Sequence, residues 1–166
     1  MRLVASALTA AAYARYGAVL EASAAGSSAN QGTAQRSDRL VDLVNDRASA
    51  GLNVAVFRCA PRRLPIEISL LEKHPRTTQA FIPMNATRYL VVVAGGGDTP
   101  DLTTLAAFVA SGRQGVSYHP GVWHHPMIAL DHETDFVCLV HEDGSRDDCV
   151  EHALAAPIAI DLAEAS

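Results

Sequence analysis

Three histidines lie close together in residues 115–126, and imidazole side chains can ligate a metal ion or move a proton near neutral pH. They are His119, His124 and His125, three of the seven histidines in the chain. One histidine alone is as often a surface or core residue as a functional one. Three within such a short stretch favour a site, and we take this stretch as the centre of the expected chemistry.

A tight turn is predicted inside this stretch. Pro120 fixes its own φ, and Gly121 tolerates a positive φ, so the backbone can reverse direction here. We expect two short strands on either side of the turn. The turn is also expected to point His119 and His124 the same way.

A second polar cluster consists of Glu72, His74 and Gln79. Side chains alternate across a strand, so Glu72 and His74 are expected to share one face, which could be the interior of a barrel. Lys73, the only lysine, should point the opposite way into solvent. The alternative is an exposed strand end in which His74 packs on Pro75.

Together the two clusters would supply one carboxylate, imidazoles and an amide. These groups suit either general acid and base catalysis or the binding of a divalent metal. The candidate catalytic residues are Glu72, His74, His119 and His124.

The elements that must position these residues are mostly strands. A helix is predicted over residues 6–15, ending at Gly17, and an exposed polar loop runs to Gly32. Residues 102–108 fit either a helical turn or a strand. Many short strands separated by turns indicate an all-β jelly roll or barrel. The predicted strands are residues 18–21, 52–58 (half-buried), 66–71, 79–83, 88–94, 127–130, 134–141 and 149–154.

Length and composition limit the class of protein. The 166 residues predict one globular domain, 1–166, with 49% hydrophobic residues. A net charge of −5 with scattered basic residues argues against a nucleic-acid partner, and no apolar run is long enough for a membrane span. The Ala-rich start of the chain is interrupted at residues 15–17, so we read it as mature protein and not as a signal peptide. Three cysteines without CxxC spacing fit a reducing cytoplasm.

The two clusters resemble the two cupin motifs. Glu72-x-His74-x-x-x-x-Gln79 is similar to the first motif, His-x-His-x-x-x-x-Glu, and Gly121-x-x-His124 is similar to the end of the second. More specifically, the chain resembles the ureidoglycolate lyase family of purine (allantoin) degradation, formerly called ureidoglycolate hydrolases. The resemblance spans nearly the whole chain and is carried by Asn30-Gln-Gly-Thr-Ala34, Gln79-Ala-Phe-Ile-Pro-Met84, Gly115-Val-x-Tyr-His119 and Trp123-His-His-Pro126.

This resemblance implies a cupin-type double-stranded β-barrel (jelly roll), to which the sequence pattern adds the short N-terminal helix. It also implies a homodimer and a carbon-nitrogen lyase of the amidine-lyase class that cleaves (S)-ureidoglycolate to glyoxylate and urea. Glu72 and Gln79 depart from the general cupin ligands, and a neutral amide is a weak ligand for a transition ion. A divalent metal such as nickel or manganese therefore stays an open expectation, with His74, His119 and His124 as ligands.

The substrate suggests how such a reaction would run. Ureidoglycolate is a hemiaminal, so one base for its hydroxyl and one acid for the departing nitrogen suffice. Glu72 or His119 is expected as the base, and His124 or His74 as the acid or as a metal ligand. Substrate binding is assigned to Gln79, Tyr118 and an arginine, with Arg113 chosen although Arg63 and Arg76 stay open. Trp123 is expected to fill the core.

Two other classes of function stay open. A metal-dependent cupin oxygenase or isomerase would need a full ligand set, which Glu72 and Gln79 do not reproduce. A non-catalytic cupin that binds a small acid would not need paired acid and base groups.

Overall fold

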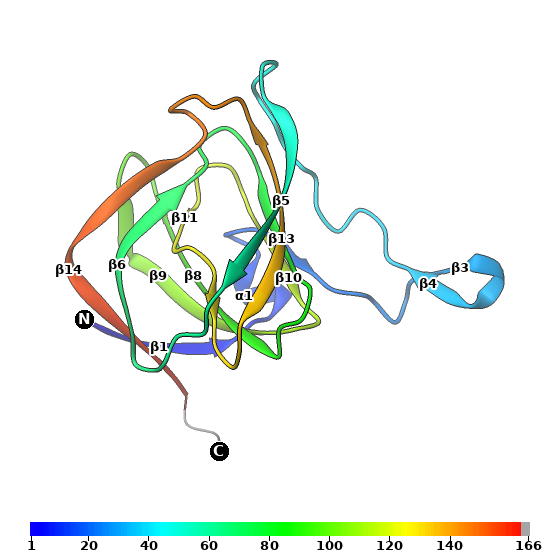
Figure 1. Cartoon of the computed structure of the whole chain (residues 1–166), viewed down its shortest axis with the longest axis horizontal. Helices are drawn as coiled ribbons and strands as arrows, with labels where there is room; N and C mark the ends of the chain where they lie inside the picture. Colours follow the sequence, from blue (N-terminus) through cyan, green and yellow to red (C-terminus); the bar gives the residue numbers. More distant parts are fainter. Residues whose placement is uncertain (164–166) are drawn as a thin grey trace.

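The computed structural model describes residues 1–163, and its regular secondary structure is almost entirely β-strand (Figure 1). The prediction of an all-β, cupin-type barrel with a short N-terminal helix is confirmed. The elements are β1 (Arg2–Ala7), α1 (Ala10–Tyr13), β2 (Val19–Leu20), β3 (Ser27–Ala29), η1 (Asn30–Gly32), β4 (Ala34–Arg36), β5 (Gly51–Cys59), β6 (Ile66–Lys73), β7 (Gln79–Pro83), β8 (Arg88–Gly96), β9 (Pro100–Ser111), β10 (Gly115–Tyr118), β11 (Trp123–His124), β12 (Ile128–Ala129), β13 (Thr134–Glu142) and β14 (Val150–Leu162).

Two large sheets carry the fold. The first has the strand order β11-β6-β14-β1-β9-β8-β12, and β11 also pairs with β8, so this sheet closes on itself. The second has the order β2-β10-β7-β13-β5. The turn predicted at Pro120 and Gly121 joins β10 of the second sheet to β11 of the first, so it carries the chain from one sheet to the other.

Apolar side chains form two clusters, and β8 contributes to both. Val91 and Val93 pack with residues of the second sheet, such as Phe136, whereas Leu90 and Val92 belong to the cluster inside the closed sheet. A strand covered on both faces has no polar face, because its alternate side chains are all buried. This explains the unbroken apolar run that the sequence shows in residues 89–94.

The N-terminal prediction is partly wrong. The predicted helix 6–15 is reduced to α1, which begins after the N-cap Thr9, whose Oγ1 accepts a hydrogen bond from Ala12 N at 3.2 Å. Ser6 and Ala7 instead end β1, where they pair in parallel with Phe108 and Val109. Helix-forming composition is overridden here because β1 closes the gap between β14 and β9.

The undecided segment 102–108 is part of a strand, β9, which pairs along β8. The strand prediction for residues 52–58 is confirmed as β5, but the half-buried pattern holds only in part. Ala55 and Cys59 on one face pack against the core, whereas Leu52, Val54 and Val56 on the other face are 51%, 62% and 60% exposed.

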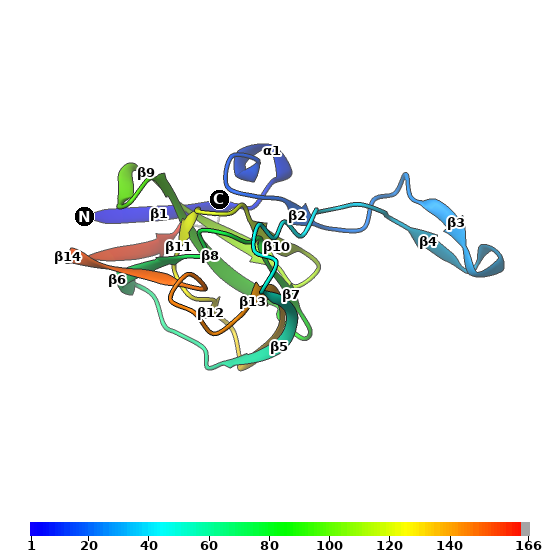
Figure 2. The ribbon, with the colours of Figure 1, turned by 90° about the horizontal axis from the view of Figure 1, so that it is seen from above.

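The polar loop predicted up to Gly32 is indeed exposed, but it forms a hairpin. Strands β3 and β4 and the turn η1 between them make an arm that projects away from the barrel (Figure 2). Asn30 and Gln31 at its tip have positive φ values of 49° and 58°. Among residues 1–163, no helix is both long and apolar enough to span a membrane.

Candidate active site

Glu72 and His124 face each other across neighbouring strands. They are register partners in the antiparallel pair of β6 and β11, with His124 Nε2 3.4 Å from Glu72 Oε1. Trp123, the residue before His124, points to the opposite side and is fully buried in the core of the closed sheet, as predicted. His124 therefore points toward the second sheet.

The tautomer of His124 makes this pair chemically informative. His124 Nδ1 lies 3.1 Å from the Val122 carbonyl, which can only accept, so Nδ1 carries a proton. Nε2 is buried and makes no hydrogen bond of good geometry. In a neutral ring, the Nε2 lone pair and the Glu72 carboxylate would repel each other. The arrangement favours either a second proton on His124 or a cation between the two groups.

His74, directly after β6, is oriented in the same manner. Its Nδ1 donates a hydrogen bond to the Asp148 carbonyl at 2.6 Å, which leaves Nε2 as the free, unprotonated nitrogen of the neutral ring. That Nε2 is buried without a hydrogen-bond partner. The ring stacks on His124 with centroids 5.5 Å apart. The unpartnered Nε2 atoms of His74 and His124 therefore lie near the same space.

Glu72, His74 and His124 can hold a cation together. One ligand atom from each residue lies within 4.8 Å of the others. Two imidazole nitrogens and a carboxylate oxygen are common ligands for divalent transition ions. The unpartnered Nε2 atoms and this donor set therefore fit a metal ion.

The local electrostatics set the charge of these groups. Burial raises the pKa of Glu72, but its interactions with His124 and His74 outweigh this effect, so the pKa lies below its ordinary value. Burial, together with the nearby His124, lowers the pKa of His74. At neutral pH, Glu72 is accordingly a carboxylate and His74 is a neutral imidazole.

The second sheet supplies the opposite wall. Tyr118 on β10 stacks on His124 with ring centroids 4.0 Å apart and an angle of 7° between the planes. Gln79 on β7 is its register partner, and its buried Oε1 has no hydrogen-bond partner. Cys138, which lies near Gln79, has its pKa raised to about 12 by burial, so it is not a thiolate nucleophile at neutral pH.

The structure does not bring His119 or Arg113 into this group. Tyr118 points inward at the end of β10, and His119 follows it on the exposed side, where it lines a hollow with Arg39 and Thr78. The two histidines do not point the same way, because the turn at Gly121 (φ 79°) moves the chain between sheets. Arg113 is exposed on the turn between β9 and β10.

The turn nevertheless helps to position the site. Gly121 N donates to the His74 carbonyl at 2.9 Å, so the end of β6 and the start of β11 are tied together.

Lys73 points away from the site, as expected, and its ammonium lies 4.5 Å from the Trp123 ring centroid. His125 is only partly buried, and burial lowers its pKa.

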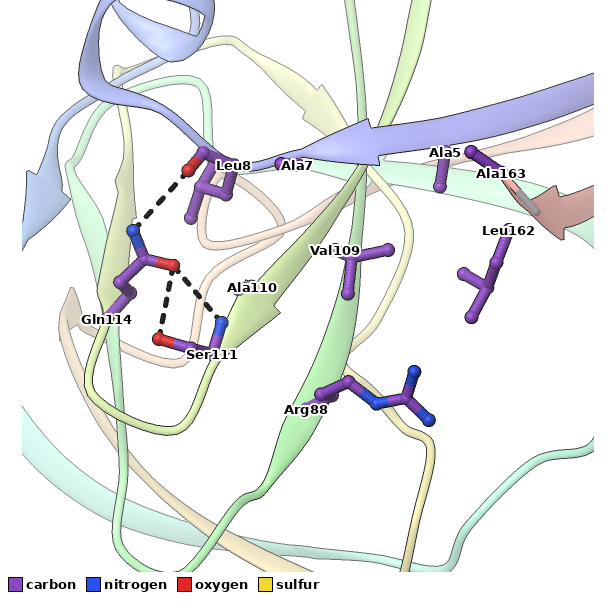
Figure 3. A pocket seen from close by; sticks show the side chains of 10 residues that line it. All are labelled: Ala5, Ala7, Leu8, Arg88, Val109, Ala110, Ser111, Gln114, Leu162 and Ala163. Atoms are coloured by element: carbon purple, nitrogen blue, oxygen red, sulfur yellow. Dashed lines mark hydrogen bonds between the residues drawn. The ribbon is translucent and has the colours of Figure 1, made fainter. Parts of the chain in front are cut away.

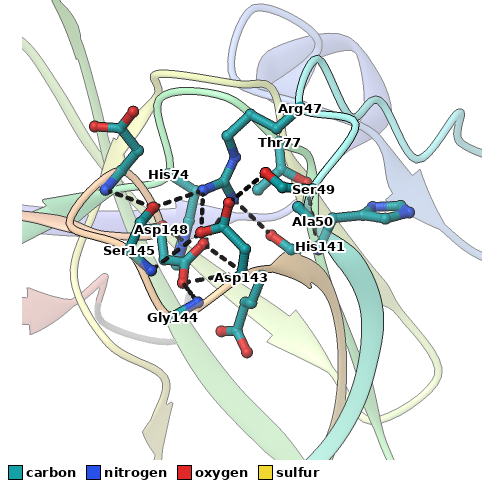
Figure 4. A network of polar contacts seen from close by, with 12 residues as sticks. Arg47, Ser49, Ala50, His74, Thr77, His141, Asp143, Gly144, Ser145 and Asp148 are labelled. Carbon is teal, nitrogen blue, oxygen red and sulfur yellow. Dashed lines mark hydrogen bonds and ion pairs between the residues drawn. The ribbon is translucent and has the colours of Figure 1, made fainter.

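A polar network behind His74 was missed by the sequence reasoning (Figure 4). Arg47 donates to Asp148 Oδ1 at 2.6 Å and to Asp143 Oδ1 at 3.0 Å, and Asp148 also provides the carbonyl that accepts from His74. Arg47 is about a hundred positions away from these aspartates in the chain. No local pattern could have linked them.

A separate groove lies beside β1 and the end of β14 (Figure 3). Its lining is mostly aliphatic. Ser111 Oγ donates a hydrogen bond to Gln114 Oε1, and Arg88 forms an ion pair with Asp131. None of its ten lining residues is a histidine or a carboxylate, so it lacks the acid and base groups of the site between the sheets. The lining residues are Ala5, Ala7, Leu8, Arg88, Val109, Ala110, Ser111, Gln114, Leu162 and Ala163.

Comparison with known proteins agrees with these motifs. A family model described as ureidoglycolate lyase matches residues 1–161. A ureidoglycolate lyase of Pseudomonas syringae pv. syringae is 37% identical over 155 residues, which cover 93% of this chain and 91% of the relative. That of Salmonella paratyphi B is 48% identical over 96 residues, or 58% and 59% of the two chains. A crystal structure of a Bacillus anthracis dTDP-4-dehydrorhamnose 3,5-epimerase matches 69% of each chain at 19% identity with a TM-score of 0.41.

Proposed function

The chain belongs to the ureidoglycolate lyase family, and we propose that it cleaves (S)-ureidoglycolate to glyoxylate and urea at the site formed by Glu72, His74 and His124. The observation that carries this proposal is the convergence of these three side chains between the two sheets, in a chain that the family matches over almost its full length.

The reaction needs two proton transfers. A base removes the proton of the substrate hydroxyl, the C–O bond becomes the carbonyl of glyoxylate, and the C–N bond breaks. An acid then places a proton on the departing nitrogen, which leaves as urea. No water is consumed. Hydrolysis of the carbamoyl group would additionally require an activated water and donors for a tetrahedral oxyanion.

The charges of Glu72, His74 and His124 suggest which residue accepts a proton and which donates one. Glu72, ionised at neutral pH, is suited to accept the hydroxyl proton. His124 holds a proton on Nδ1 and faces Glu72 through Nε2, so its doubly protonated form can donate from Nε2 to the leaving nitrogen. His74, neutral with a free Nε2, can accept a hydrogen bond from the substrate. Gln79 and Tyr118 shape the opposite wall.

A divalent ion such as nickel or manganese is proposed as the alternative to these roles, because His124 Nε2 and the Glu72 carboxylate cannot bind an ion and transfer protons at the same time. Glu72, His74 and His124 would hold it, and His119, expected earlier as a ligand, is exposed and outside the group. When bound, such an ion would polarise the oxygens of the substrate and make its hydroxyl more acidic.

The products decide the reaction type. Purified protein supplied with racemic ureidoglycolate is expected to release glyoxylate and urea in equal amounts, because elimination leaves the carbamoyl group intact. Both products are measured in a preparation free of urease. Release of ammonia and carbon dioxide in place of urea would contradict the lyase assignment. Binding without turnover would indicate a small-acid-binding cupin, and dependence on O₂ would indicate an oxygenase.

We also propose that the protein forms a homodimer through β5 and the neighbouring part of the second sheet. Most outward side chains of this region are apolar and exposed, with Arg58 near the end of β5 as the charged exception, and β5 has one free edge. An exposed apolar patch beside a free strand edge is typical of a surface that another protein chain covers. The exposed apolar residues are Leu52, Val54, Val56, Ile82 and Met84.

Light scattering at micromolar concentration tests this proposal. The wild-type protein is expected to show twice the mass of one chain, which is 17.6 kDa. The double variant V54K/V56K should be shifted toward the monomer, because two buried ammonium groups would oppose the interface. Leu102→Lys, at an exposed leucine on β9, is the matched control and should stay dimeric. A wild-type mass of one chain would refute the dimer.

A cytoplasmic location is proposed as well. Cys59, Cys138 and Cys149 are all free thiols, which fits a reducing compartment.

A further inference from the structure

We propose that Arg47 is a positioning residue for the candidate active site: by binding Asp148, it holds the backbone carbonyl that fixes the tautomer and direction of His74. The inference rests on the proposed function in assuming that His74 Nε2 is used there. Arg47 lies outside the sequence motifs described above, and its side chain binds none of Glu72, His74 and His124 directly.

The guanidinium of Arg47 is the centre of the network in Figure 4. Its side chain is only 9% exposed. One terminal nitrogen donates to Asp143 Oδ1 at 3.0 Å and to Ser145 Oγ at 3.1 Å. The other donates to Asp148 Oδ1 at 2.6 Å and to the His141 carbonyl at 3.2 Å. Arg47 therefore ties the end of β13 to the loop that follows it.

Besides Arg47, the loop of residues 143–148 is held to the rest of the protein by Ser49, whose Oγ donates to Asp143 Oδ2 at 2.7 Å, and by His74 at the Asp148 carbonyl. Residues 143–147 are exposed, and Gly144 has a positive φ of 80°. The Asp148 carboxylate accepts from Gly144 N at 2.7 Å and from Asp143 N at 3.1 Å, so the loop folds around this carboxylate. Because Arg47 binds the same carboxylate from the protein side, it fixes the end of the loop that carries the Asp148 carbonyl.

The main chain of Asp148 then acts on His74. The His74 Nδ1 proton is held by the Asp148 carbonyl at 2.6 Å, which keeps Nε2 deprotonated and directed at Glu72 and His124. If the carbonyl moved, the ring would be free to rotate or to take the other tautomer. A proton on Nε2 would remove the lone pair that the site presents. Partners of this kind behind a functional histidine fix its tautomer and orientation.

The experiment compares three variants at one fixed pH. Arg47→Met keeps the length of the side chain but loses its charge and donors. Asp148→Asn weakens the ion pair with Arg47 but keeps the backbone carbonyl that binds His74. It is the test variant if Arg47→Met does not fold. Arg88→Met is the matched control, because Arg88 also binds an aspartate, Asp131, through two nitrogens but has no link to His74.

The main readout is the ring ¹⁵N spectrum of His74 in chelator-treated protein, in which no bound ion fixes the tautomer; the signal is assigned by its loss in His74→Gln. Wild type and Arg88→Met should show a proton on Nδ1 alone. Arg47→Met and Asp148→Asn should show a mixture of tautomers, with kcat lowered about 10- to 100-fold and KM changed much less. The spectrum does not depend on turnover, so it tests Arg47 even if ureidoglycolate is not the substrate.

Two results would overturn the proposal. One is a folded Arg47→Met or Asp148→Asn protein in which His74 keeps the wild-type spectrum. The other is the same change of spectrum in Arg88→Met, which would mean that the loss of any arginine–aspartate ion pair disturbs the site.

Discussion

Replacing His124 by alanine is expected to lower kcat by about 10²-fold or more, with the fold retained. His124 is the residue on which the site converges: it faces Glu72, stacks on His74 and is covered by Tyr118. If it protonates the departing nitrogen, its loss removes an interaction made in the transition state, so kcat and kcat/KM should fall together. Steady-state kinetics of urea release measure both, and circular dichroism reports the fold.

His119→Ala is the matched control for this variant. His119 belongs to the same histidine-rich stretch, but it is exposed and outside the group of Glu72, His74 and His124. It is expected to keep most of its activity. The sequence alone made the two histidines equal candidates, so the comparison tests the structural placement directly. A large loss in His119→Ala with little loss in His124→Ala would contradict the proposed site.

Removal of a bound metal is expected to have the second large effect. If a divalent ion lies between Glu72, His74 and His124, dialysis against a chelator should lower turnover by about 10²-fold or more, and nickel or manganese should restore it. The reason is that neutral imidazole and ionised carboxylate groups would bind the ion, and the ion would make the substrate hydroxyl more acidic.

The metal content of the protein provides the control. Metal analysis should find the ion in wild type and in His119→Ala but not in His124→Ala, because only His124 belongs to the ligand group. Full activity in protein shown to be metal-free would contradict the metal proposal. It would leave direct acid and base catalysis by Glu72 and His124 as the mechanism.

The sequence by itself determined the features that depend on local chain geometry. Alternation along residues 72–74 predicted that Glu72 and His74 share a face while Lys73 turns away, and the structure agrees. Gly121 marked the turn because it tolerates the positive φ found there. The apolar runs marked most of the strands, since period and composition are local properties.

Only the tertiary structure decided which of these residues meet. The chain passes from one sheet to the other at Gly121, so His124 joins Glu72 while His119, five residues earlier, stays exposed. Which face of β5 packs against the core depends on how the sheets are stacked, which its own alternation cannot reveal. Arg47 reaches His74 only through Asp148. Contacts between residues so far apart in the chain follow from strand pairing and register, which no local pattern in a single sequence specifies.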